Sequence, residues 1–108
     1  MELIKSISGI RGIVGKTLNK TEVNSYSNIF SSIQPVGDIL LARDTRPHGK
    51  KLYESILKTL TRTGRNVVDC GIIPTPTAQF IIKEKELSGG IVITASHNPV
   101  EWNGLKFL

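Results

Sequence analysis

The stretch Gly90-Ile91-Val92-Ile93-Thr94 decides the fold, because it is the strongest signal of a buried strand in the sequence. A continuous run of apolar side chains is typical of a strand that is covered on both faces of a sheet. The run Ile39-Leu40-Leu41, within segment 38–42, has the same character, and segment 66–70 is a third candidate strand. Strands of this kind are typical of α/β proteins, in which helices cover the sheet.

Two segments have apolar residues at helical spacing. The first helix is expected to begin at about Asn19, which can cap it together with Glu22 three residues later. The second is expected over 48–63, with Gly64 as its terminator. Their apolar faces are Val23, Tyr26, Phe30 and Ile33 in the first helix and Leu52, Tyr53, Ile56, Leu57 and Leu60 in the second.

The remaining elements complete an alternating order. A short helix is expected after residue 74, with Thr75 as its cap and Pro76 at its first position. A short edge strand is expected at 2–5, before the Gly-rich stretch 8–15, and a last strand at 104–108. The order β–α–β–α–β predicts an α/β fold of three layers, α/β/α, with a mixed, mostly parallel sheet.

Length and composition bound the number of domains. The chain has 108 residues, of which 39% are hydrophobic, enough for one small domain with a core. We therefore expect residues 1–108 to form a single domain. Because the sequence stops inside the last predicted strand, we expect that domain to be incomplete at its C-terminal end.

Charge and cysteine content exclude several classes of function. The formal net charge is +5, but the basic residues are scattered and only 6% of residues are aromatic, so no nucleic-acid partner is expected. No apolar run approaches the roughly 20 residues that span a bilayer. The single cysteine, Cys70, excludes an internal disulfide and is expected to be a packing residue. These features predict a cytoplasmic protein with no membrane partner.

Candidate functional residues lie after the predicted strands. Ligands of such sheets bind beyond the carboxyl ends of the strands, where the loops 43–47, 71–76 and 95–99 are expected. In the last loop Ser96 would be exposed beside main-chain N–H groups that can hold an anion, and His97 can move a proton near neutral pH. On the residues alone, the loop is either a nucleophile loop or a polar exit from a strand.

Four segments, in order, carry a resemblance to a known family. Ile93-Thr94-Ala95-Ser96-His97-Asn98-Pro99, followed by Asn103-Gly104-Leu105-Lys106, resembles the active-serine signature of the α-D-phosphohexomutases. Three further segments resemble motifs of the same family, namely Ser8-Gly9-Ile10-Arg11-Gly12, Ala42-Arg43-Asp44-Thr45-Arg46 and Gly71-Ile72-Ile73-Pro74-Thr75-Pro76. The chain thus resembles the N-terminal domain I of these enzymes over nearly its whole length.

The resemblance implies roles for individual residues. Ser96 matches the serine that is phosphorylated in the resting enzyme, and it exchanges this phosphoryl group with a hexose phosphate. The transfer would be supported, through positive charge and acid–base catalysis, by His97, Arg11 and Lys106. The set of phosphate- and substrate-binding candidates is Arg11, Ser96, Asn98, Asn103 and Lys106. Arg43 and Asp44 are expected to form an ion pair that orders their loop rather than to act on the substrate.

The resemblance also implies cofactors and partners, whose binding sites this chain would form only in part. The family places Mg²⁺ on an Asp-x-Asp-x-Asp loop of a second domain, whereas Asp38, Asp44 and Asp69 here lie far apart in sequence. The phosphate on Ser96 would be the only metal ligand from this chain. A hexose 1,6-bisphosphate is the implied intermediate and activator, and the implied partners are the hexose phosphate and the remaining domains. The isolated chain is therefore expected to be inactive.

One departure and two alternatives accompany this interpretation. Lys5-Ser6-Ile7 stands where the family often has Phe-Gly-Thr, which leaves Arg11 in place but changes its neighbours. The alternative function is a non-catalytic phosphate-binding or interaction module of the same fold. A basic nucleic-acid-binding domain is the third hypothesis, and no basic stripe or aromatic platform supports it. The sequence does not identify the sugar of the substrate, although the serine segment is slightly more similar to those of phosphoglucosamine or bifunctional mutases.

Overall fold

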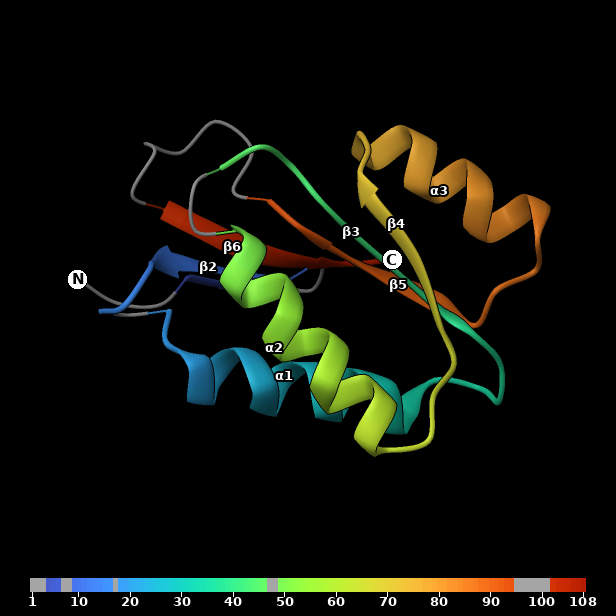
Figure 1. Ribbon diagram of the computed structural model, residues 1–108, viewed down its shortest axis with the longest axis horizontal. Coiled ribbons are helices and arrows are strands. Elements are labelled where there is room, and N and C mark those ends of the chain that lie inside the picture. Colours follow the sequence, from blue (N-terminus) through green and yellow to red (C-terminus); the bar gives the residue numbers. More distant parts are fainter. Residues whose placement is uncertain (1–3, 7–8, 17, 47–48, 95–101) are drawn as a thin grey trace.

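A computed structural model describes residues 4–6, 9–16, 18–46, 49–94 and 102–108 (Figure 1). The described strands are β1 (Ile4–Ser6), β2 (Gly9–Ile13), β3 (Ile39–Arg43), β4 (Val67–Ile72), β5 (Gly89–Ile93) and β6 (Trp102–Phe107). The described helices are α1 (Lys20–Ile33), α2 (Gly49–Arg62) and α3 (Thr75–Glu84). The predicted alternation of strands and helices is therefore confirmed.

The strands form one sheet in the order β1-β2-β6-β5-β3-β4. β3 is parallel to both β4 and β5, whereas the pairs β1–β2, β2–β6 and β5–β6 are antiparallel. The predicted mixed sheet is confirmed, but parallel pairing is restricted to one half of it. The reason is the short connection between β5 and β6, since a return to parallel pairing needs a crossover of a dozen or more residues.

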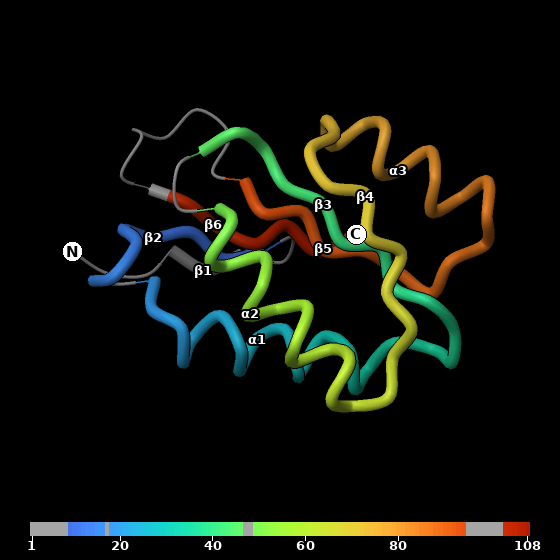
Figure 2. Tube along the Cα trace, in the orientation of Figure 1, coloured from blue at the N-terminus to red at the C-terminus, as the bar shows by residue number. Residues whose placement is uncertain are grey.

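Three layers are present, as predicted. α1 and α2 cover one face of the sheet, where Ile39, Leu41, Ile91, Ile93 and Leu105 pack against the helices. α3 covers the other face of the β3–β5 half, where Leu40, Ala42 and Val92 meet Ala78. Figure 2 shows that α1 and α2 both begin at the end of the molecule where β3 and β5 terminate. The sheet therefore separates an α1–α2 face from an α3 face.

The helix ends follow local sequence signals. Asn19 caps α1, and its Oδ1 atom accepts a hydrogen bond from the main-chain N–H of Glu22 at 2.9 Å. Gly64, the second residue after α2, has a φ angle of +90°, which favours glycine. The predicted cap of α3 is wrong by one residue, because Pro74 is the N-cap and Thr75 is the first helical residue.

The structure corrects one expectation and adds one strand. Ile33 is 72% exposed, because the buried face of α1 passes instead through the serines at 27 and 31. The Gly-rich stretch 8–15 contains the strand β2, which is hard to predict because glycine is uncommon in strands. Gly9 and Gly104 allow the close pairing of β2 with β6, since a Cβ atom at Gly104 would overlap the main-chain oxygen of Ile10.

Candidate functional site

The candidate site lies at the edge of the sheet where the parallel strands end. β3, β4 and β5 have their carboxyl ends at this edge, and β6 begins there because it runs back beside β5. The loops that follow Arg43 and Ile72 and the segment that joins Ile93 to Trp102 therefore share one edge, as the sequence predicted. Ser96, His97 and Asn98 lie within that segment and outside the described residues.

Arg11 and Lys106 lie on the same face of neighbouring strands. In the antiparallel pair of β2 and β6, Arg11 is opposite Gly104 and Lys106 is opposite Gly9. The residues next to them, Ile10 and Leu105, are buried in the core under α1 and α2, so the two cations occupy the opposite face. Residues that are diagonal in such a pair lie about 7–8 Å apart, which lets both side chains address one anionic group.

Glycines make room for these cations. A Cβ atom at Gly104 would lie 2.6 Å from Cγ of Arg11, and a Cβ atom at Gly9 would overlap the main-chain oxygen of Leu105. Arg11 is exposed, whereas Lys106 is half-buried. Lys106 also borders a shallow pocket beside α3, lined by Gln79, Ile82, Lys83, Phe107 and Leu108. The cationic face is therefore open on one side and bounded by α3 on the other.

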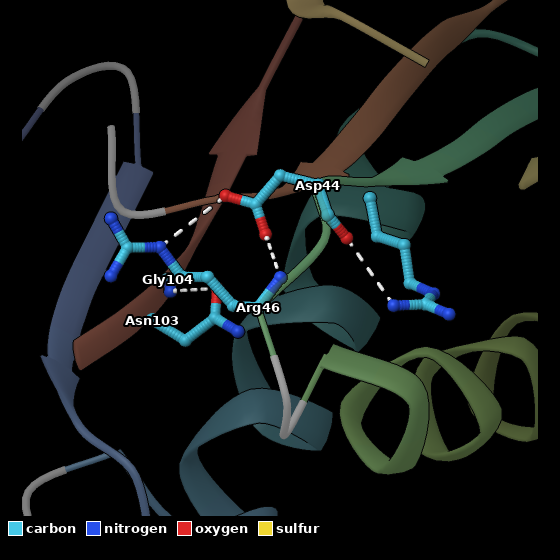
Figure 3. A network of polar contacts seen from close by, with 5 residues as sticks. Asp44, Arg46, Asn103 and Gly104 are labelled. Atoms are coloured by element: carbon cyan, nitrogen blue, oxygen red, sulfur yellow. Dashed lines mark hydrogen bonds and ion pairs between the residues drawn. The ribbon is translucent and has the colours of Figure 1, made fainter. Parts of the chain in front are cut away.

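The loop after β3 is ordered by Asp44 (Figure 3). Its Oδ1 atom accepts from the main-chain N–H of Arg46 at 3.0 Å, and its Oδ2 atom lies 3.4 Å from Nε of Arg46. Arg43 instead donates from Nη1 to the main-chain oxygen of Asp44 at 3.2 Å. The predicted ion pair of Arg43 with Asp44 is thus wrong, because the two-residue spacing to Arg46 suits a turn that the aspartate closes.

Main-chain bonds fix the residues on either side of the serine segment. The N–H of Asp44 donates to the oxygen of Ile93 at 3.0 Å, and the N–H of Thr94 donates to the oxygen of Gly104 at 2.9 Å. The Asp44 loop is therefore attached to the last residue of β5. Sequence analysis missed Arg46 as a member of this network, although the Arg-Asp-x-Arg spacing carries the signal.

Asn103 lies on the other face of the sheet from Arg11 and Lys106. It is completely buried, its Oδ1 atom accepts from the N–H of Gly104 at 2.9 Å, and its Nδ2 atom has no partner among the described residues. A Cβ atom at Gly49, the first residue of α2, would lie 3.8 Å from this Nδ2 atom. The structure therefore places Asn103 between β6 and α2, apart from the cationic face.

The tyrosine and the cysteine near this edge are not activated. The hydroxyl of Tyr53 donates to the main-chain oxygen of Leu41 at 2.9 Å and contacts the Asp69 carboxylate, and it accepts from the N–H of Gly71 at 3.1 Å. Burial, followed by the hydrogen bond to Asp69, raises the pKa of Tyr53. Burial and the charge of Asp69 also raise the pKa of Cys70. Both groups stay protonated at neutral pH, which indicates structural roles.

The described residues contain neither a metal-binding cluster nor a membrane-spanning helix. They contain no group of three or more histidine, cysteine, aspartate or glutamate side chains placed to hold a metal ion. No helix among them is long and apolar enough to cross a membrane.

Comparison with known proteins identifies relatives of the chain. Residues 3–108 match the family described as phosphoglucomutase/phosphomannomutase, alpha/beta/alpha domain I. The chain is 40% identical over 107 residues to the phosphoglucosamine mutase of Prochlorococcus marinus subsp. pastoris, covering 98% of this chain and 24% of that protein. It is 39% identical over 100 residues to the phosphoglucosamine mutase of Thermotoga neapolitana, covering 93% and 23%.

A solved structure shows the same fold. A crystal structure of a Thermus thermophilus protein assigned as a phosphomannomutase superimposes with a TM-score of 0.89 and 25% sequence identity. The match covers 97% of this chain and 25% of that protein. The chain thus spans about a quarter of the length of the curated and solved relatives that it matches.

Proposed function

Because the chain belongs to the phosphoglucomutase/phosphomannomutase family, as its α/β/α domain I, we propose that it carries the phosphoryl-transfer residues of a phosphohexomutase. The reaction interconverts a hexose 1-phosphate and a hexose 6-phosphate. The observation that carries the proposal is the placement of Arg11 and Lys106 on one face of β2 and β6. β6 follows directly after the segment that contains Ser96.

Ser96 is the proposed carrier of the phosphoryl group. A phosphate on its Oγ atom is transferred to the free hydroxyl of the bound sugar monophosphate, which breaks the P–Oγ bond and gives a hexose 1,6-bisphosphate. The intermediate turns over in the site, and Oγ of Ser96 then accepts the other phosphoryl group from it. The serine is phosphorylated again, and the isomeric monophosphate leaves.

The cations supply charge where the transferred group passes. Phosphoryl transfer depends mainly on positioning and on positive charge around the phosphate oxygens. The guanidinium of Arg11 can bind two oxygens at once, whereas the ammonium of Lys106 acts as a point charge. His97 moves a proton at the reacting hydroxyl, and Asn98 helps to hold the phosphate beside it.

Three residues are proposed to support the site without contacting the substrate. Asp44 holds the loop after β3 through Arg46, and Arg43 fixes the main chain of the same loop. Asn103, which the sequence placed among the phosphate-binding residues, is buried on the α1–α2 side. Its proposed contribution is to set the start of β6, and thereby the position of Lys106, rather than to contact the phosphate.

Metal and further domains enter as part of this proposal. The described residues offer no metal cluster, and the ligand that we propose for Mg²⁺ from this chain is a phosphate oxygen on Ser96. When bound, Mg²⁺ would neutralise charge on that phosphate. The other metal ligands and the residues that select the sugar are proposed to belong to the remaining domains of a cytoplasmic enzyme. The 108-residue chain alone is therefore proposed to be inactive.

A chimera tests this function. The chain replaces the corresponding region of the Thermotoga neapolitana phosphoglucosamine mutase, and turnover is measured with hexosamine and hexose monophosphates in the presence of Mg²⁺. We expect turnover, phosphoserine at position 96 by mass spectrometry, and loss of both in Ser96→Ala. Ser25→Ala, the same substitution at an exposed position on α1, is the control and keeps full activity. We expect Arg11→Met and Lys106→Met to lower kcat by about 10²–10³-fold.

Three outcomes would contradict the proposal. Full turnover in the Ser96→Ala chimera would refute the serine assignment. Mg²⁺-dependent turnover by the 108-residue chain alone would refute its inactivity. A folded chimera that binds hexose phosphate without turnover would support the alternative, a non-catalytic phosphate-binding module.

A further inference from the structure

A groove runs between α1 and α2, on the side of the helices that faces away from the sheet. It has a volume of about 380 Å³, within the range of small-molecule sites. The α1–α2 groove is lined by Lys20, Asn24, Lys51, Glu54, Ser55, Lys58, Thr59 and Arg62. Because the sheet lies between this groove and the face of Arg11 and Lys106, the groove is separate from the proposed phosphoryl-transfer site.

The lining is strongly cationic. It contains four basic side chains and one carboxylate, Glu54, and the basic side chains come from both walls of the groove. Lys20 lies on α1, and Lys51, Lys58 and Arg62 lie on α2, all of them exposed. Among the described residues the one ion pair is that of Asp44 with Arg46, so no carboxylate in the described chain neutralises the four cations by direct contact.

At the bottom of the groove, the side-chain amide of Asn24 presents a donor. Ser55 and Thr59 are buried, and their hydroxyl groups donate to Oδ1 of Asn24 at 2.7 Å and to the main-chain oxygen of Ser55 at 3.0 Å. With Oδ1 of Asn24 occupied in this way, its Nδ2 atom is the end that can donate to a ligand. The lining therefore offers ammonium, guanidinium and amide donors, and a ligand that satisfies them must be rich in acceptor oxygens and negatively charged.

The spacing of the cations sets the size of that ligand. Lys51 and Lys58 are seven residues apart on one helix, which corresponds to about 10.5 Å of axial rise, and Arg62 lies about 6 Å further along the axis. Linked phosphate groups can contact all of these cations at once without the lysine and arginine side chains converging on one point. We propose that the α1–α2 groove binds a small polyanion that carries two or more linked phosphate groups, bridging Lys20 of α1 and the basic residues of α2.

The probes for this site are inorganic phosphate, pyrophosphate and tripolyphosphate, titrated into the ¹⁵N-labelled 108-residue chain without Mg²⁺. We expect tripolyphosphate to bind at least tenfold more tightly than phosphate, with amide shifts centred on Asn24, Ser55 and Thr59. Lys58→Ala is expected to weaken tripolyphosphate binding at least fivefold. The control is Lys85→Ala, at the exposed end of α3, which should leave the affinity unchanged.

Added salt distinguishes a site from a diffuse attraction. Binding at a defined groove weakens with salt but keeps the same pattern of shifted amides, because screening lowers the charge term without moving the ligand. Equal affinity for phosphate and tripolyphosphate would overturn the proposal, as would equal loss in Lys58→Ala and Lys85→Ala. Tighter binding of an oligoglutamate peptide than of tripolyphosphate would assign the groove to an acidic protein segment and would also overturn it.

Discussion

The Nη2 atom of Arg65 lies 2.6 Å from the main-chain oxygen of Ser31, so a residue that follows α2 holds the C-terminal end of α1. The same guanidinium donates to the main-chain oxygens of Gln34, Pro35 and Gly37 at 2.7–2.9 Å. Helix α1 has no basic residue in its own last turn, and Arg65 supplies the positive charge that favours a helix C-terminus. One side chain thus connects α1, the turn before β3 and the end of α2.

Replacing Arg65 with alanine is expected to lower the free energy of unfolding by about 2 kcal/mol, because several charge-assisted hydrogen bonds are lost together. Urea denaturation measures the change. Arg65→Lys should recover only part of the loss, since an ammonium group cannot reach all of these oxygens at once. Arg62→Ala, at an exposed position on α2, is the matched control, and an equal effect of Arg62→Ala would contradict the proposed role of Arg65.

Tyr53→Phe is expected to lower stability by about 1–2 kcal/mol at neutral pH, because the hydroxyl bridges α2 to β3 and β4. The pKa of Tyr53 is raised, so the folded state keeps this proton above the pH at which an unfolded tyrosine loses it. The stabilisation is therefore complete below about pH 10 and falls as the pH rises further.

The measurement is the difference in unfolding free energy between the native chain and Tyr53→Phe, taken from pH 7 to pH 11. This difference should be constant up to about pH 9.5 and then decrease by at most about 1.4 kcal/mol per pH unit. Taking the difference removes the contribution of the lysines, which both proteins share. A difference that stays flat to pH 11 would show that the Tyr53 pKa is not raised.

Gly104→Ala is expected to destabilise the chain by about 2–3 kcal/mol, because the added Cβ atom meets main-chain oxygen and the Arg11 side chain. Gly49→Ala is the matched control. Its Cβ atom would meet the end of the Arg43 side chain at 3.4 Å, and the effect should stay within about 0.5 kcal/mol. Thermal unfolding of both variants checks the prediction, which fails if the two changes cost the same.

Alkylation of Cys70 is expected to be slow in the folded chain. The raised pKa of its thiol lowers the thiolate fraction at pH 8, and the thiolate is the reacting form. Iodoacetamide should therefore react several-fold more slowly with the folded chain than with the chain in urea, after correction with a short cysteine peptide in both solvents. Equal corrected rates would show that Cys70 is an ordinary exposed thiol.

The features that the sequence predicted correctly depend on neighbours in the chain. The strand expected at 90–94 is β5 (Gly89–Ile93), one residue earlier. The cap at Asn19 and the glycine at position 64 that follows α2 were confirmed, and each of these features follows from a few adjacent residues. The three layers follow from the order of these elements, because a strand with two apolar faces needs cover on both sides.

The features that escaped prediction depend on contacts between distant segments. Arg65 finds its acceptors 28–34 residues away, and nothing in its local sequence distinguishes it from a surface arginine. The strand β2 was not predicted, because its glycines are required by β6, which lies opposite. At the candidate site, the common face of Arg11 and Lys106 follows from that same pairing, whereas the serine segment itself lies outside the described residues.

The hairpin pairing of β5 with β6 has a consequence for engineering. Ile93 is opposite Leu105, and Thr94 is bonded to Gly104, so the chain leaves the sheet and re-enters it at adjoining positions. The two strands are paired through Ile91 with Phe107, Val92 with Lys106 and Ile93 with Leu105. The residues on either side of the segment 95–101 are therefore held by one antiparallel pair of strands. Libraries confined to residues 95–101 would vary the chemistry of this segment without changing a residue of either strand, so that folding and turnover could be selected separately.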